Sequence, residues 1–123
     1  MNFNDNIPIY LQIQDYLLKQ IFTEKLKPGE RIPSIRQLAL DLTVNINTIQ
    51  HALKGLTDQE ILITKRGDGK YVTTDQTLLD KLREQTIKSE INEFSTKMQS
   101  YGVSNPELVN LIERYVGGKN DAD

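Results

Sequence analysis

Cysteine is absent from the 123-residue chain, and histidine occurs only once, as His51. The lack of cysteine excludes disulfides, thiolate metal sites and cysteine nucleophiles, and it fits a reducing compartment. A catalytic or metal-binding role for one histidine would need partner side chains that its segment does not supply. The turn Gly67-Asp68-Gly69 also lacks the Lys-Ser/Thr of a phosphate-binding P-loop. We therefore predict neither an enzyme nor a protein that holds a metal or another cofactor.

Long apolar runs are absent as well. No run approaches the roughly 20 residues that are needed to span a bilayer. The N-terminal segment MNFNDNIPIY lacks the basic start and the apolar core of a signal peptide. We expect a soluble, cytoplasmic protein without a membrane partner.

An excess of basic charge is missing too, because the formal net charge is −2. Residues 1–74 hold nine Lys/Arg against eight Asp/Glu, and residues 75–123 hold six against nine, so the two parts carry +1 and −3. Any surface that attracts DNA must therefore be a local patch. The segment KRGDGK at residues 65–70 provides one, since its three cations surround a single Asp68.

Three helices are predicted in the first part of the chain. The first begins near Pro8, which is tolerated at a helix start because no intrahelical N–H is lost there. Ser34 caps the second helix, with Gln37 at the capping-box position, and Asn45 caps the third after a turn at Thr43-Val44. In chain order, their predicted apolar stripes are Ile9, Ile13, Tyr16, Leu17 and Ile21, then Ile35, Leu38, Ala39 and Leu42, then Ile49, Ala52, Leu53 and Leu56.

Two β-prone stretches, residues 61–64 and 70–74, flank Gly67-Asp68-Gly69, a turn sequence that suits positive φ values. A hairpin of two strands is marginal by itself, so we expect it to pack on the helices. The order helix, turn, helix, hairpin is typical of a winged helix-turn-helix, whose second helix enters the DNA major groove.

Two further helices are predicted after Thr74. Tyr101-Gly102 ends the first, and Ser104 caps the second with Glu107 at its capping-box position. Two thin helices cannot close a core alone, so their apolar faces either pack on the winged domain or meet the same surface of a second chain. We expect the second arrangement, a homodimer interface. The predicted interface comprises Leu78, Leu82, Ile87, Ile91, Phe94, Met98, Leu108, Leu111, Ile112 and Tyr115.

The predicted fold class is therefore mainly α with a small β-hairpin. It consists of a winged helix-turn-helix DNA-binding domain over residues 8–74, a helical dimerisation region over residues 75–118 and a disordered tail at residues 119–123.

Three motifs resemble those of GntR-type transcription regulators. They are PGERIPSIRQLA at residues 28–39, VNINTI at residues 44–49 and the wing sequence RGDG at residues 66–69, and the resemblance covers residues 8–74. The short C-terminal region is similar to the YtrA subfamily, whose members carry two C-terminal helices that build a dimer. The resemblance implies a sequence-specific DNA-binding regulator, a repressor, that reads an inverted-repeat operator in double-stranded DNA as a homodimer.

The resemblance also places Arg36 where the family contacts DNA, and a guanidinium there can pair with phosphate or guanine. Backbone N–H groups and short polar side chains at the start of the third helix suit phosphates and base edges. Asn and Gln pair with adenine, Lys neutralises phosphate, and glycines let the wing approach the minor groove. The predicted DNA-binding residues are Ser34, Arg36, Gln37, Asn45, Ile46, Asn47, Thr48, Gln50, His51, Lys54, Lys65, Arg66, Gly67, Gly69 and Lys70.

Some positions depart from the family's pattern. Ile46 stands where many relatives have Arg or Pro, and Gln50 stands where Arg is common. Because these departures remove guanine-reading groups, we predict an A/T-leaning operator, with Ile46 against thymine methyl groups. Thr43 replaces the Gly that is usual at the turn between the two helices.

Two alternatives stay open. A winged helix can also serve protein–protein interaction or assembly, and the near-neutral charge of residues 1–74 fits that role, whereas the polar start of the third helix and the basic wing favour DNA. An unidentified small-molecule effector is a further candidate partner near the C-terminal helices, where Tyr101 and Tyr115 offer amphipathic walls.

Overall fold

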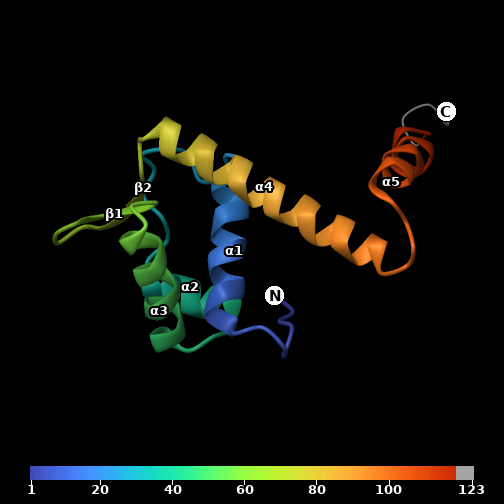
Figure 1. Ribbon diagram of the computed structural model, residues 1–123. Coiled ribbons are helices and arrows are strands. Elements are labelled where there is room, and N and C mark those ends of the chain that lie inside the picture. The colour runs from blue at the N-terminus through green and yellow to red at the C-terminus, as the bar shows by residue number, and fades with distance from the viewer. Residues whose placement is uncertain (119–123) are drawn as a thin grey trace. The chain divides into compact units, whose positions relative to one another are not determined.

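The computed structural model describes residues 1–118, so the tail predicted at residues 119–123 lies outside the described residues. The elements are helices α1 (Ile9–Phe22), α2 (Ile35–Leu42), α3 (Ile46–Asp58), α4 (Gln76–Gln99) and α5 (Asn105–Ile112), a short π-helix η1 (Glu113–Gly117), and strands β1 (Leu62–Lys65) and β2 (Gly69–Val72) (Figure 1). The chain divides into two compact units, Met1–Lys81 and a second that begins at Leu82. The predicted fold class, mainly helical with a small antiparallel hairpin, is confirmed.

The core of the first unit lies between α1, α2 and α3. The predicted stripes of these helices supply most of it, and burial of each such Leu or Ile side chain stabilises the fold by about 1.5 to 3 kcal/mol. Ile9, the first residue of α1, lies at the end of its stripe and is 43% exposed. The buried apolar side chains of the unit are Ile13, Leu17, Ile21, Ile32, Leu38, Leu42, Ile49, Ala52, Leu53, Leu56, Ile61, Leu62, Val72 and Leu79.

The start of α2 confirms one half of the predicted capping box. The Gln37 backbone N–H donates to Ser34 Oγ (3.1 Å), so Ser34 caps the helix. The other half is wrong. The Gln37 side-chain amide donates to Asp41 Oδ1 (2.7 Å), its neighbour one turn along the helix, and does not reach back to the cap.

The turn between α2 and α3 depends on Thr43, which has a left-handed backbone conformation (φ 56°, ψ 53°). Beyond it, the Val44 N–H donates to the Ala39 carbonyl (3.0 Å), and the Asn45 side chain caps α3 by accepting from the Asn47 N–H (2.7 Å). This geometry is the one that a glycine adopts freely. A β-branched threonine in its place costs roughly 1 to 2 kcal/mol.

The hairpin pairs Leu62 with Val72 and Lys65 with Gly69, and Figure 1 shows it projecting from the C-terminal end of α3. Its strands are those predicted, each displaced by about one residue toward the turn. The turn closes where the Asp68 N–H donates to the Lys65 carbonyl (2.9 Å), and Gly67 takes the positive φ (76°) that such a turn needs.

A third extended segment, residues 29–32, holds the hairpin against the helices. The Ile32 N–H donates to the Lys70 carbonyl (3.0 Å), the Val72 N–H donates to the Glu30 carbonyl (2.9 Å), and Arg31 and Tyr71 form a β-bridge. Because two strands alone are marginal, this added pairing explains why the wing has a defined position on its unit.

In the second unit, α4 stops where predicted. Gly102 has a φ of 83°, and the Val103 N–H donates to the Met98 carbonyl (3.1 Å), as in a glycine-ended helix. Ser104 caps α5 by accepting from the Glu107 N–H (3.3 Å). Leu108 is the buried residue of α5. Among residues 1–118, no helix is both long enough and apolar enough to cross a membrane.

We expect Thr43→Gly to raise the free energy of unfolding by about 1 kcal/mol, because glycine removes the steric cost of the left-handed conformation. Urea denaturation measures the change. The control is Thr23→Gly at the C-cap of α1, where φ is −95° and the hydroxyl donates to the Lys19 carbonyl (2.6 Å), so that this variant loses stability. Equal destabilisation by the two variants would contradict the claim that the backbone at Thr43 is strained.

Candidate nucleic-acid interface

The third helix has two distinct sides. Its inner stripe, Ile49, Ala52, Leu53 and Leu56, is at most 1% exposed. The opposite side is exposed along the first three turns, and it carries Ile46, Asn47, Gln50, His51 and Lys54. Thr48 is half-buried between the two sides. The amide-bearing side of α3 therefore points outward from the core, as the sequence predicted.

Several polar side chains on this surface have no partner within the part of the chain that the structure describes. Across residues 1–118, the side chains of Arg36, Asn47 and Gln50 make no hydrogen bond or ion pair. Lys54 pairs with Asp58 (2.8 Å), but both side chains are mostly exposed, and such a surface pair contributes at most about 1 kcal/mol. Their hydrogen-bonding groups are thus available to phosphates and base edges at little cost.

His51 has a partner that the sequence did not reveal. Its ring stacks on Tyr10 of α1, with the centroids 3.9 Å apart and the planes 10° from parallel. The stack fixes the imidazole against α1 at the edge of the exposed side of α3. No pattern in the sequence joins these two residues, because only the packing of α1 on α3 brings them together.

The wing carries its cations in different environments. Arg66 is exposed at the turn, Lys70 donates to Thr64 Oγ1 (2.8 Å), and the Lys65 ammonium lies 3.9 Å from the centre of the Tyr71 ring. The last contact is a cation–π interaction that directs the lysine along one face of the hairpin.

Arg31 is a residue that the sequence analysis missed. Its Nη2 donates to the Asp68 carbonyl oxygen (2.5 Å), and its Nε lies 3.7 Å from Asp68 Oδ1. The Tyr71 hydroxyl donates to the other carboxylate oxygen, Oδ2. This hydrogen bond is the main reason that the pKa of Tyr71 is raised above its ordinary value of 10.0, with partial desolvation and the negative charge of Asp68 adding to it and Arg31 opposing it.

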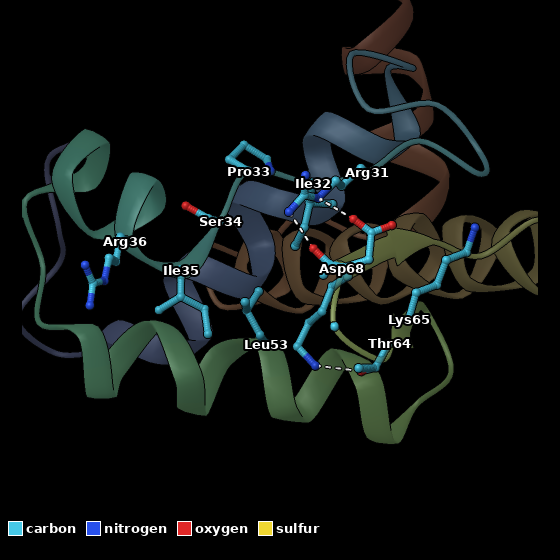
Figure 2. Close-up of a pocket in the computed structure, with 13 residues that line it drawn as sticks. Arg31, Ile32, Pro33, Ser34, Ile35, Arg36, Leu53, Thr64, Lys65 and Asp68 are labelled. Carbon is cyan, nitrogen blue, oxygen red and sulfur yellow. Dashed lines mark hydrogen bonds and ion pairs between the residues drawn. The ribbon is translucent and has the colours of Figure 1, made fainter.

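A hollow of about 470 Å³ joins the start of α2 to the wing. Figure 2 shows Arg36 on one side of it and Asp68 and Lys65 on the other, with Ile35 and Leu53 between them. It brings together the predicted residues Ser34, Arg36, Lys65, Gly67, Gly69 and Lys70. The other predicted residues, Gln37, Arg66 and those from Asn45 to Lys54, do not line it. Since its rim is cationic and its floor apolar, the hollow suits the passage of an anionic backbone across it.

These features define a winged helix-turn-helix of the kind that transcription regulators use to bind DNA. Residues 9–72 match the family described as bacterial regulatory proteins, gntR family, and the chain belongs to this GntR family. It is therefore a DNA-binding transcription regulator, and the prediction that it is not an enzyme is confirmed by its relatives, which are regulators.

Its layout is similar to that of YtrA-type members over nearly the whole chain. It is 31% identical to the HTH-type transcriptional repressor YtrA of Bacillus subtilis over 120 residues, which covers 93% of this chain and 92% of that protein. A GntR family transcriptional regulator from Listeria monocytogenes has a similar structure, with a TM-score of 0.86, 34% identity, and coverage of 91% of this chain and 98% of that one.

The first unit alone is similar to a domain that has been solved with DNA. The DNA-binding domain of AraR in complex with operator ORE1 has a TM-score of 0.53 and 26% identity, and the match covers 58% of this chain and 90% of that one. DNA binding by this part of the family weakens the alternative of a winged helix that serves only protein–protein assembly.

We expect Asp68→Ala to lower the pKa of Tyr71 toward about 10, because it removes the acceptor that stabilises the protonated phenol. A raised folded-state pKa means that the hydrogen bond contributes stability that is fully present below about pH 10 and is lost as the pH rises through that pKa. An NMR titration of the Tyr71 ring measures the pKa. Asp5→Ala, which removes an exposed carboxylate at the N-terminus, should leave the midpoint unchanged, and an unchanged midpoint in Asp68→Ala would contradict the assignment.

Proposed function

We propose that the protein is a repressor that binds an inverted-repeat operator as a homodimer in the cytoplasm. The exposed and unpaired polar side of α3, set beside a basic wing, is the observation that carries the proposal. A helix of this kind lies in the major groove, and a two-fold dimer reads half-sites about one helical turn apart or a multiple of it. The relative YtrA, itself named a repressor, supports the sign of regulation.

Base reading falls to the N-terminal turns of α3. Asn47 and Gln50 present free amides, which form two hydrogen bonds with adenine, and Ile46 is exposed where a thymine methyl can meet it. This combination favours an A/T-leaning operator. For the other predicted residues, among which Arg36 was expected to meet either phosphate or guanine, we assign contacts to the DNA backbone. These residues are Ser34, Arg36, Gln37, Asn45, Thr48, His51, Lys54, Lys65, Arg66, Gly67, Gly69 and Lys70.

Two substitutions separate base reading from backbone contact. Gln50→Ala should weaken operator binding by about 1 to 3 kcal/mol and relax selectivity at one base pair. Arg36→Ala should weaken binding to all sequences alike, by about tenfold, and lower the salt slope of log K by about one. The operator comes from binding selection on random DNA, and the affinities come from fluorescence anisotropy.

Gln59→Ala, an exposed glutamine at the opposite end of α3, is the control and should leave the affinity unchanged. Unaltered affinity in both Gln50→Ala and Arg36→Ala would overturn the assignment of this face. A selected motif dominated by G and C would overturn the A/T preference alone.

Dimerisation is assigned to the second unit, where α4 carries an apolar seam of Ile87, Ile91, Phe94 and Met98. The spacing of four, three and four residues is that of a heptad repeat, and the first three side chains are exposed. We assign a second copy of this chain as the partner that covers this seam. Glu90 and Lys97 flank the seam on the same side, so the opposite charges of two copies can pair across it.

In an antiparallel pairing of two α4 helices, Glu90 and Lys97 form ion pairs between the subunits. If Ile91 lies level with Phe94 of the partner subunit, Glu90 comes beside Lys97 of the partner subunit, and two-fold symmetry repeats the pair. In a parallel pairing, Glu90 would face only Ser95 of the partner subunit. The remaining predicted interface residues, Leu78, Leu82, Leu108, Leu111, Ile112 and Tyr115, and an effector near Tyr101, stay predictions.

Charge exchange tests the antiparallel pairing. Glu90→Lys and Lys97→Glu should each weaken dimerisation on the order of tenfold, because each variant places like charges together twice. An equal mixture of the two variants should restore the dimer. Sedimentation equilibrium at low salt measures the association, with Glu93→Lys, which lies off the seam, as the control.

Failure of the mixture to recover would rule out the antiparallel register. A wild-type protein that stays monomeric at all concentrations would rule out the homodimer itself.

A further inference from the structure

The wing holds one acidic residue among its cations, and this poses an electrostatic problem. The Asp68 side chain is 49% exposed at the wing turn, where the proposed function places DNA phosphates. A carboxylate there repels the polyanion unless its charge is offset within the protein.

The structure offsets this charge with groups from outside the turn. The Arg31 guanidinium contacts both the carbonyl oxygen and one carboxylate oxygen of Asp68, and the Tyr71 hydroxyl donates to the other carboxylate oxygen (Figure 2 shows the Arg31 contacts). The same Tyr71 ring lies beneath the Lys65 ammonium. Arg31 thus meets the turn of the wing at Asp68, and Asp68 is joined through Tyr71 to Lys65 on the other strand.

The backbone at Gly69 is shaped around this arginine. A Cβ atom added to Gly69 would lie 2.9 Å from Arg31 Nε, closer than such atoms approach, and the φ of 149° also disfavours a larger residue. The guanidinium therefore packs directly against the hairpin backbone, and it does not extend freely into solvent.

Arg31 is itself anchored to the helix-turn-helix. The next residue, Ile32, is 4% exposed and donates its N–H to the Lys70 carbonyl (3.0 Å), and Ser34, the cap of α2, follows two positions later. A shift of the wing relative to α2 would break the contacts of Arg31 with Asp68. The residue is therefore suited to hold the wing at a fixed position beside α2.

We propose that Arg31 is a positioning residue for DNA binding, which neutralises Asp68 and fixes the wing turn so that Lys65 and Arg66 meet the DNA backbone. This inference rests on the proposed function, namely that the wing contacts DNA. The competing role is a direct contact of Arg31 with a phosphate, since its side chain is 54% exposed.

A double-mutant cycle distinguishes the two roles. Arg31→Gln should weaken operator binding about tenfold, because it leaves Asp68 uncompensated and frees the wing. In an Asp68→Asn background, the same substitution should cost less than about twofold, since the charge that Arg31 offsets is gone. A loss in the Asp68→Asn background that equals or exceeds the loss in the wild type would overturn the proposal in favour of direct phosphate contact.

Lys27→Gln removes a cation from the same loop and is the matched control, and we expect it to leave the affinity within about twofold. Tyr71→Phe keeps the ring beneath Lys65 but loses the hydroxyl, so it serves as the second variant if Arg31→Gln fails to fold by circular dichroism. It should weaken binding a few-fold in the wild type and not in the Asp68→Asn background. Equal losses in the two backgrounds would again overturn the proposal.

The wild-type protein separates failure of this inference from failure of the proposed function. If it binds its selected operator while the cycle shows no coupling, only the role of Arg31 is wrong. If it binds no DNA, both proposals fail. Hydrogen exchange at the Asp68 amide, which donates to the Lys65 carbonyl, should be faster in Arg31→Gln than in Lys27→Gln. Equal exchange rates in the two variants would overturn the claim that Arg31 fixes the wing turn.

Discussion

The pairing of residues 29–32 with strand β2 is the interaction on which the rest of the first unit depends. Its backbone hydrogen bonds add a third extended segment to a hairpin that is marginal by itself. The same segment leads directly into Ser34, the cap of α2. A single stretch of backbone therefore sets both the position of the wing and the start of the helix-turn-helix, and the hollow between them follows from it.

On the proposed DNA-binding surface, the side chains that cap helices and the side chains assigned to base reading are different ones. Ser34 and Asn45 use their side-chain oxygens to cap helices, while the side chains of Asn47 and Gln50, in the first turns of α3, make no hydrogen bond among residues 1–118. The free amides cost little, since they stay in water until DNA arrives. Under the proposed function, this division leaves base reading to α3 and orientation to the groups around it.

Most of the local structure was predictable from short-range rules. Caps at Ser34, Asn45 and Ser104, the stripes of α1 to α3 and the end of α4 near Gly102 all depend on residues within about one helical turn, and the structure has them. The prediction fails at Gln37 because its side chain can turn back to accept from the Ser34 backbone N–H or turn forward to donate to Asp41, and the spacing fits both. The spacing of apolar residues predicted which face of α3 turns inward, and its burial pattern agrees.

By itself the sequence determined the order of the elements, the helix caps and the family, because each is recorded in residue types a few positions apart. Only the tertiary structure decided which side chains meet across the fold. Arg31 and Asp68 are 37 positions apart, and the stack of Tyr10 on His51 likewise needs α1 packed on α3. Contacts of this kind have no period along the chain, since they form only after backbone pairing and core packing have fixed where each element lies.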